Sequence, residues 1–265
     1  VSRNYNRFTE RKARERLRQE CPPLLGIDEH TLHRNGTYVT TFCDLKAHKV
    51  FDVVQGRSGS ELAQYLRGLK GREKVRVICI DLCHPYRAMI RKWFPHARIV
   101  ADRFHAVRIV MHHFLDQIKE LVPEIKYQRR YVRALRKRPE KLSDYQKEAL
   151  EELFKLFPFI KILYEKMREI CDLFNKKGQS MRSCRSHAGA LVRHIEDLRG
   201  HSFDKLHTLA NTLEDWSEQI ACMWRFRKNN SITEGFHRKM KLIQRRAYGF
   251  RNFNNYRLRV IAQCG

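Results

Sequence analysis

The sequence predicts a mixed α/β protein in which a long helical segment interrupts the sheet-bearing part of the chain. Three observations support this prediction: three consecutive strand-like runs near the start, an alternation of helix-like and strand-like runs after them, and a middle section without strand signals. The chain has 265 residues, of which 42% are hydrophobic, so it can bury a sizeable core.

The first three strand-like runs are short and follow one another closely, at residues 24–30, 37–45 and 48–54. Asn35-Gly36 separates the first two runs, and this dipeptide is a strong signal for a tight β-hairpin turn. We therefore expect these strands to form an antiparallel meander.

Helices and strands alternate after the meander. The expected elements are a helix at 58–70, a buried strand at 74–82, a helix at 85–94, a strand at 97–103 and a long helix at 104–121. Alternating units of this kind require parallel strands, because the crossover helix returns the chain to the same end of the sheet. The order β-β-β-α-β-α-β-α is that of a ribonuclease-H-like fold.

From Pro123 to about Arg227 the hydrophobic periodicity is helical throughout. We expect an all-helical insertion here, after which the segment from Ser231 returns to the first domain as its last helix. The predicted organisation is a basic N-terminal arm at 1–22, the first part of the core at 23–122, the insertion at 123–227, and the last helix with a basic C-terminal segment at 228–265.

The formal net charge of +25 is spread over the N-terminal arm, the middle and the C-terminal third. Such an excess favours nucleic acid as the partner. A charge-neutralising structural protein or a protein that binds acidic membranes would share this charge. Neither would explain the single carboxylate that stands within the basic C-terminal third.

The eight cysteines are scattered without C-x-x-C spacing, and no signal peptide or long apolar run is visible. We therefore expect a reduced, cytoplasmic setting and no membrane partner. Cys79, Cys83 and His84 could contribute to a structural zinc site. No fourth ligand follows at a suitable spacing, however, and Cys79 lies within an apolar strand-like run.

Glu234 is the only carboxylate after Gln219, and eleven Lys/Arg residues surround it between Arg225 and Arg259. A helix that starts near Ser231 would give it a basic face, opposite an apolar face made of Phe236, Met240, Ile243 and Ala247. A basic strip with one acid suits a polyanion whose phosphate is held beside a metal ion. The alternative is a capping box, in which the Ser231 and Glu234 side chains accept from each other's backbone amides.

Two further acids belong to apolar strands. Asp28 lies inside the first predicted strand, and Asp81 closes the fourth. These strands are central neighbours in the predicted topology, so the two carboxylates should approach each other where such sheets bind ligands. Close carboxylates repel unless a divalent ion neutralises them, which points to Mg²⁺. Each acid alone could instead cap a strand end or form an ion pair there.

Asp102 and His105 follow the fifth predicted strand with Asp-x-x-His spacing. Both would lie at a strand-to-helix turn, where the histidine could orient a phosphate or move a proton. In the alternative interpretation Asp102 caps the next helix and His105 packs beneath it. We regard the two residues as possible neighbours of an active site.

Basic side chains near Glu234 are the first candidates for holding a DNA backbone, namely Arg238, Lys241, Arg245, Arg246 and Arg251. A second candidate is the basic run at 127–141, which could track DNA through salt-sensitive phosphate contacts from Arg129, Arg130 and Arg133. Tyr248, Phe250 and Phe253 could stack on unpaired bases near a cleaved end, or could pack the last helix on the sheet.

Several strings in the chain resemble the DDE transposases of bacterial insertion sequences, specifically the ISL-three family. The strings are GIDE, ICIDLCHPY, VADRFHAV and NNSITEGFHRKMKLIQRRAYGFRNFNNYRLRV, and the similarity covers about residues 24–262. The last string is the most specific. The string ADRFH also looks like an Asp-x-x-His signature of related transposase groups.

The resemblance implies a ribonuclease-H-like catalytic domain with a metal-binding triad of Asp28, Asp81 and Glu234. It implies cleavage and joining of double-stranded DNA at the element's ends and in a target, by a homo-oligomer in the bacterial cytoplasm and nucleoid. Two Mg²⁺ ions about 3.5–4 Å apart would be the cofactors, with Mn²⁺ able to substitute. The interval from Asp81 to Glu234 is 153 residues (234 minus 81), which the helical insertion explains.

Members of this family usually carry an N-terminal zinc-binding region and a helix-turn-helix module, and neither is visible here. The sequence therefore leaves three alternatives to an active transposase. They are a truncated or domesticated DNA-binding remnant, a ribonuclease-H-like nuclease without strand transfer, and a structural nucleic-acid protein. Analysis of reaction products would separate them.

Overall fold

The computed structural model describes residues 19–32, 36–178, 180–226 and 231–265, together with Arg7, Phe8, Glu10, Arg11 and Glu15 of the N-terminal arm. The chain divides into two compact units. The sheet unit comprises Val1–Phe104 and Phe226–Gly265, and the helical unit comprises His105–Arg225. The domain boundaries expected from the sequence stay a prediction. The two units differ from them mainly because most of the long helix after the fifth strand belongs to the helical unit.

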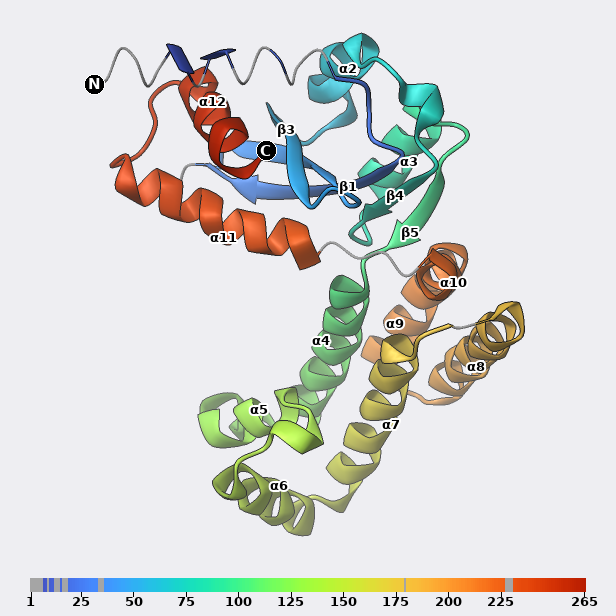
Figure 1. Cartoon of the computed structure of the whole chain (residues 1–265). Coiled ribbons are helices and arrows are strands. Elements are labelled where there is room, and N and C mark those ends of the chain that lie inside the picture. Colours follow the sequence, from blue (N-terminus) through green and yellow to red (C-terminus); the bar gives the residue numbers. More distant parts are fainter. Residues whose placement is uncertain are drawn as a thin grey trace. The chain divides into compact units, whose positions relative to one another are not determined.

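A five-stranded mixed sheet forms the centre of the sheet unit (Figure 1). Its strands are β1 (Leu24–Thr31), β2 (Tyr38–Asp44), β3 (Lys49–Gln55), β4 (Val77–Ile80) and β5 (Arg98–Ala101), in the order β3-β2-β1-β4-β5. The first three strands pair antiparallel, whereas β4 runs parallel to both β1 and β5. The predicted α/β class and all five predicted strands are therefore confirmed.

The residues of the central strands explain why they lie inside. All four residues of β4 are buried, and β1 is buried along most of its length rather than at every second residue. Such continuous burial is typical of strands that are covered on both faces. The first hairpin contains Asn35, which lies outside the described residues, and Gly36, whose φ of +87° is the left-handed conformation that glycine adopts without strain.

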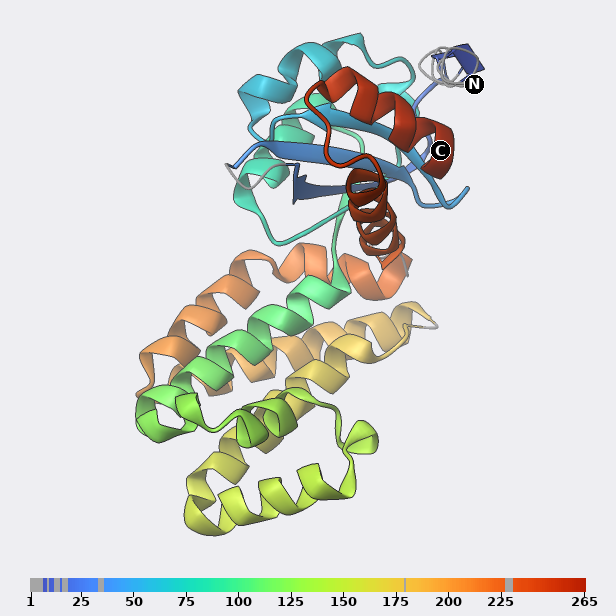
Figure 2. The same cartoon turned by 90° about the vertical axis from the view of Figure 1, so that its left-hand side faces the viewer.

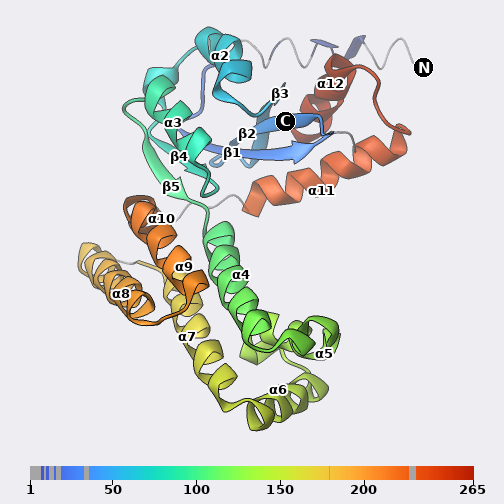
Figure 3. The same ribbon diagram turned by 180° about the vertical axis from the view of Figure 1, so that it is seen from behind.

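Four α-helices and one short 3₁₀ helix, η1 (Arg72–Lys74), belong to the described sheet unit. The α-helices are α2 (Gly59–Gly68), α3 (His84–Trp93), α11 (Ser231–Arg246) and α12 (Phe253–Cys264). A capping box between Ser58 and Glu61 begins α2. Helix α11 lies along β1 and β2, and α12 packs against β3 (Figures 1 and 3).

The sequence predicted one last helix, and the structure has two. The chain turns after α11 at Tyr248 and Gly249, which both have positive φ, and a new helix begins at the N-cap Asn252. The Asn252 side chain accepts from the amide of Asn254 at 2.8 Å. This strong cap gives the second helix its own start.

The helical unit consists of stacked helices and two short 3₁₀ turns (Figure 2). Its elements are α4 (Arg103–Leu121), η2 (Pro123–Tyr127), α5 (Arg129–Arg136), η3 (Pro139–Lys141), α6 (Asp144–Leu156), α7 (Pro158–Asn175), α8 (Met181–Gly200), α9 (Asp204–Asp215) and α10 (Ser217–Phe226). The helical pattern at 143–174 is divided before Pro158, which lacks the amide needed to continue α6. Trp216 and Trp224 are buried core residues.

Candidate active site

Two carboxylates lie side by side at the carboxyl edge of the parallel strands. β4 and β5 pair with Ile80 opposite Ala101, and Asp81 and Asp102 are the next residues of the two strands. The amide of Asp102 donates to the carbonyl of Ile80 at 2.7 Å and so extends this pairing. Asp102 is buried and Asp81 is half-buried. The register of the sheet therefore fixes the acidic pair.

His105 completes a cluster of three possible metal ligands. It lies in the first turn of α4, which continues directly from β5 and Asp102. One ligand atom each of Asp81, Asp102 and His105 lies within 4.8 Å of the other two. Carboxylate oxygens suit Mg²⁺ and Mn²⁺, and an imidazole nitrogen is compatible with Mn²⁺. The structure thus brings Asp102 and His105 next to Asp81, which the sequence suggested.

The thiol of Cys79 is surrounded by negative charge at this edge of the sheet. Burial raises its pKa well above the ordinary value, and the charges of Asp102, Asp81 and Asp28 raise it further. Asp28, Asp81 and Asp102 directly follow the paired residues Ile27, Ile80 and Ala101 of three neighbouring strands. A cation bound at this edge would offset the repulsion among carboxylates placed in this way.

Asp28 lies on β1, the next strand. β1 and β4 pair with Ile27 opposite Ile80, so Asp28 and Asp81 follow a matched pair of residues. The side chain of Asp28 is only 11% exposed, and its Oδ2 lies 3.5 Å from Nδ1 of His237 on α11. Helix α11 therefore supplies a residue that contacts this carboxylate.

A chain of hydrogen bonds continues from His237 to α12. Nε2 of His237 lies 3.1 Å from Oγ1 of Thr41, which in turn lies 3.2 Å from Nδ1 of His30. Nε2 of His30 lies 2.7 Å from the hydroxyl of Tyr256. The network fastens both C-terminal helices to the face of β1 and β2 that carries Asp28.

His30 is a neutral member of this network. Burial lowers its pKa to about 3, and the positive charges of His237 and Lys241 lower it in the same direction. A neutral imidazole donates from one ring nitrogen and accepts at the other, so it can link Thr41 to Tyr256.

Neither histidine of the network was predicted from the sequence. Two periodicities could have found them. His30 lies two residues after Asp28 and so on the same face of β1, and His237 lies almost one turn after Glu234 on α11.

Glu234 occupies the first turn of α11 and is half-exposed. Its Oε1 accepts from a guanidinium nitrogen of Arg238 at 2.9 Å. Among the residues that the structure describes, the group of mutually close ligand atoms includes neither Glu234 nor Asp28. The triad of Asp28, Asp81 and Glu234 therefore stays a prediction. The alternative interpretation of Glu234, a capping box, depends on the Ser231 side chain, which lies outside the described residues.

Helix α11 has the two faces that the sequence predicted, with one shift. Met240 and Ile243 are buried and Phe236 is half-buried, whereas Ala247 is exposed beyond the helix end. Thr233 is also buried on this inward side. The candidate DNA contacts of this region are all exposed, namely Arg238, Lys241, Arg245, Arg246 and Arg251.

The candidate contacts of the helical unit differ among themselves. Arg129 and Arg133 are exposed on α5. Arg130 instead forms an ion pair with Glu152 at 2.6 Å, and its guanidinium lies 4.5 Å from the centre of the Tyr131 ring. Arg130 therefore has a structural role within this unit, and the other two arginines face solvent.

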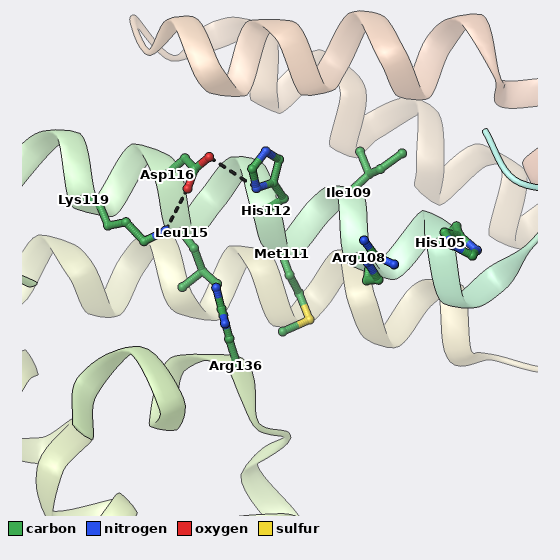
Figure 4. A pocket seen from close by; sticks show the side chains of 9 residues that line it. All are labelled: His105, Arg108, Ile109, Met111, His112, Leu115, Asp116, Lys119 and Arg136. Carbon is green, nitrogen blue, oxygen red and sulfur yellow. Dashed lines mark hydrogen bonds and ion pairs between the residues drawn. The ribbon is translucent and has the colours of Figure 1, made fainter. Parts of the chain in front are cut away.

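A pocket of about 530 Å³ lies beside α4 in the helical unit (Figure 4). Apolar side chains and several cations line it: His105, Arg108, Ile109, Met111, His112, Leu115, Asp116, Lys119 and Arg136. Its single carboxylate, Asp116, lies 2.9 Å from Lys119 Nζ and 3.3 Å from His112 Nδ1. The pocket has the size of a small-molecule site and suits an anionic group with an apolar part.

An acidic cluster at the edge of a mixed sheet, in a chain with a net charge of +25, suits a protein of the transposase class. A transposase family profile matches residues 25–260. The chain therefore belongs to the ISL-three family of DDE transposases. It is also similar to the transposase for insertion sequence element IS1001 of Bordetella parapertussis, with 25% identity over 249 residues, or 90% of this chain and 60% of the relative.

The chain thus spans about 60% of the length of that curated relative. Neither comparison favours a nuclease or a binding-only remnant. Within the described residues, the structure has no helix that is both long enough and apolar enough to cross a bilayer.

Proposed function

We propose that this chain carries the catalytic centre of a transposase that cleaves phosphodiester bonds at the ends of an insertion sequence and joins them to target DNA. The observation that carries the proposal is the acidic cluster at the carboxyl edge of the parallel strands, in a strongly basic member of a transposase family. We further propose that the sheet unit is ribonuclease-H-like. Its strand order, with an antiparallel meander beside two parallel strands, supports this assignment.

Asp28 and Asp81 are the proposed central metal ligands, with Asp102 and His105 beside them. The ligand atoms of Asp81, Asp102 and His105 lie close together. Their carboxylate oxygens fit a hard divalent cation, and the imidazole is compatible with Mn²⁺. Two Mg²⁺ ions, or Mn²⁺ in their place, would activate the attacking oxygen and stabilise the leaving oxygen. His237 would hold the Asp28 carboxylate in one orientation through its contact at 3.5 Å.

Glu234 is the proposed third acid of the triad. Its present partner, Arg238, has a side chain that is 80% exposed. An ion pair at such a surface contributes about 0–1 kcal/mol, so Glu234 can exchange Arg238 for a cation at little cost. Arg238 would then be available to a DNA phosphate.

The exposed cations of α11 and of the following turn would hold double-stranded DNA at the element's end. Arg129 and Arg133 on α5, and Arg108 and Arg136 at the α4 pocket, would contact further phosphates. Phosphate contacts of this kind give affinity and position without reading sequence. We also propose that the active form is a homo-oligomer that holds two ends.

The test is a joining reaction. The full-length protein that contains this chain is incubated with pre-cleaved DNA ends taken from the borders of its own element, a plasmid target, and Mg²⁺ or Mn²⁺. We expect joined products from the wild type, and a loss of at least a thousandfold for Asp81→Asn or Glu234→Gln with DNA affinity nearly unchanged. Lys161→Ala, an exposed change on α7, is the matched control. Equal joining by the wild type and the two acid variants would refute the proposal.

A further inference from the structure

The turn between α11 and α12 holds a tyrosine in an unfavourable backbone conformation. Tyr248 has φ +52° and Gly249 has φ +96°. The amide of Gly249 donates to the carbonyl of Gln244 at 2.9 Å, and the amide of Tyr248 donates to that of Arg245 at 3.1 Å. These bonds close the C-terminus of α11 with a left-handed turn, for which glycine or asparagine is the usual residue. A bulky aromatic residue in this conformation is strained and is more common at functional sites.

The three aromatic residues of this region have different surroundings. Phe250 packs edge-on against Tyr256, with ring centres 5.4 Å apart, and Phe253 lies 6.2 Å from the same ring. Tyr256 is itself fully buried in the sheet unit. Tyr248, in contrast, is 101% exposed. Packing therefore anchors Phe250 and Phe253, and the turn presents Tyr248 to solvent.

The structure thus separates two roles that the sequence could not distinguish, namely packing of the last helix and stacking on a base. Phe250 and Phe253 stabilise the attachment of α12, and the ring of Tyr248 adds no such contact. Because the ring is fully exposed, burial does not offset the strain of this backbone conformation, which favours a role in binding a ligand.

The surroundings of Tyr248 indicate the chemistry of that ligand. Three arginines flank it in the chain, namely Arg245, Arg246 and Arg251, and all three are exposed. A flat aromatic ring with several arginines close to it in the chain is complementary to a flat base that is linked to phosphates. Pairing and stacking hold the bases of a duplex in place, so the base that can leave the stack and lie on the ring is an unpaired one.

We propose that Tyr248 is a stacking platform for an unpaired base of DNA, with the flanking arginines on the adjacent phosphates. The inference rests on the proposed function, because it assigns the base to a DNA end that the protein processes. The closed turn fixes the backbone of Tyr248 before the ligand arrives, which reduces the entropy lost on binding.

The test compares two DNA ligands that differ in one feature. Both are duplexes of equal length, one blunt and one with a short 3′ overhang that contains 2-aminopurine. For the wild type we expect tighter binding to the overhang DNA and quenching of 2-aminopurine fluorescence. Tyr248→Ala should weaken binding to the overhang DNA about tenfold and abolish the quenching, because stacking on one aromatic ring contributes a factor of this order. Binding to the blunt DNA should stay unchanged.

A second variant separates stacking from stability. Tyr248→Asn removes the ring but suits the left-handed conformation, so its melting temperature should equal or exceed that of the wild type while overhang affinity falls as in Tyr248→Ala. Tyr248→Phe keeps the ring and should behave as the wild type. Tyr145→Ala, which changes an exposed tyrosine of α6, is the control and should have no effect.

The outcomes distinguish this inference from the proposed function. If the wild type binds neither DNA, the proposed function fails and the inference fails with it. If the wild type binds both ligands and Tyr248→Asn binds the overhang DNA as tightly as the wild type, the stacking inference is wrong and the proposed function stands.

Discussion

At the scale of single residues, His237 decides how firmly the Asp28 carboxylate is held. Its Nδ1 lies 3.5 Å from Oδ2 of Asp28, and Thr41 fixes the other side of the ring at 3.1 Å. The imidazole therefore has one allowed orientation. If Asp28 binds a metal ion, as proposed, a residue that orients it in this way would change the metal affinity about 10- to 100-fold.

We therefore expect His237→Ala to weaken Mn²⁺ binding by about tenfold or more, measured by titration calorimetry without DNA. His237→Asn keeps an amide donor near the same place and should lose less. Unchanged Mn²⁺ affinity in His237→Ala would show that Asp28 is positioned by the strand alone. A melting temperature recorded for each variant separates a local effect from unfolding.

The sequence predicted some of these residues and missed others for a physical reason. Asp81, Asp102 and His105 follow strands that the hydrophobic pattern identifies, so their convergence follows from the pairing of those strands. His30 and Tyr256 meet only because α12, more than two hundred residues away in the chain, packs back onto the sheet. No local pattern encodes that contact.

At the scale of elements, one buried ion pair fixes α12 to β3. Nε of Arg257 donates to Oδ1 of Asp52 at 2.7 Å, and a second guanidinium nitrogen donates to Oδ2. Asp52 is only 2% exposed. Asp52 is buried because α12, whose separate existence the sequence did not predict, covers that part of β3.

Arg257→Leu should destabilise the protein by about 3–5 kcal/mol, because it leaves the Asp52 carboxylate buried without a partner. Thermal unfolding measures the loss, and hydrogen exchange should localise it to β3 and α12. The double variant Asp52→Asn with Arg257→Leu removes the isolated charge and should recover part of the stability. If the single and double variants are equally destabilised, lost packing rather than the unpaired charge is responsible.

The helical unit should lose stability in mild acid. Burial lowers the pKa of His113, His187 and His194 below the usual value of about 6.5. The unfolded chain therefore binds more protons than the folded chain as the pH falls below about 6.5, and the free energy of unfolding decreases. The melting temperature should be lower at pH 5.5 than at pH 7.5, and His194→Gln should reduce that difference. A melting temperature that rises on acidification would contradict this.

At the scale of the whole molecule, the charge of +25 produces attraction to DNA that no single contact explains. Carboxylates on the same helices pair with several of the lysines of the helical unit, for example Lys147 with Asp144 and Lys161 with Glu165. The exposed face of α11 has one carboxylate, Glu234, for several cations. The sequence alone identified this asymmetry, because it depends on composition rather than on long-range packing.

The triple variant Lys241→Ala, Arg245→Ala and Arg246→Ala should reduce the salt dependence of duplex binding. Each lost phosphate contact lowers the slope of log K against log salt by about 0.9, so three contacts lower it by nearly 3. Lys147→Ala, Lys155→Ala and Lys161→Ala together make the same change in net charge on α6 and α7, and fluorescence anisotropy from about 50 to 200 mM salt compares the two. A large change in the first variant alone locates the DNA on α11. Equal slopes in both would mean that DNA responds to the total charge and that the face of α11 has no special role.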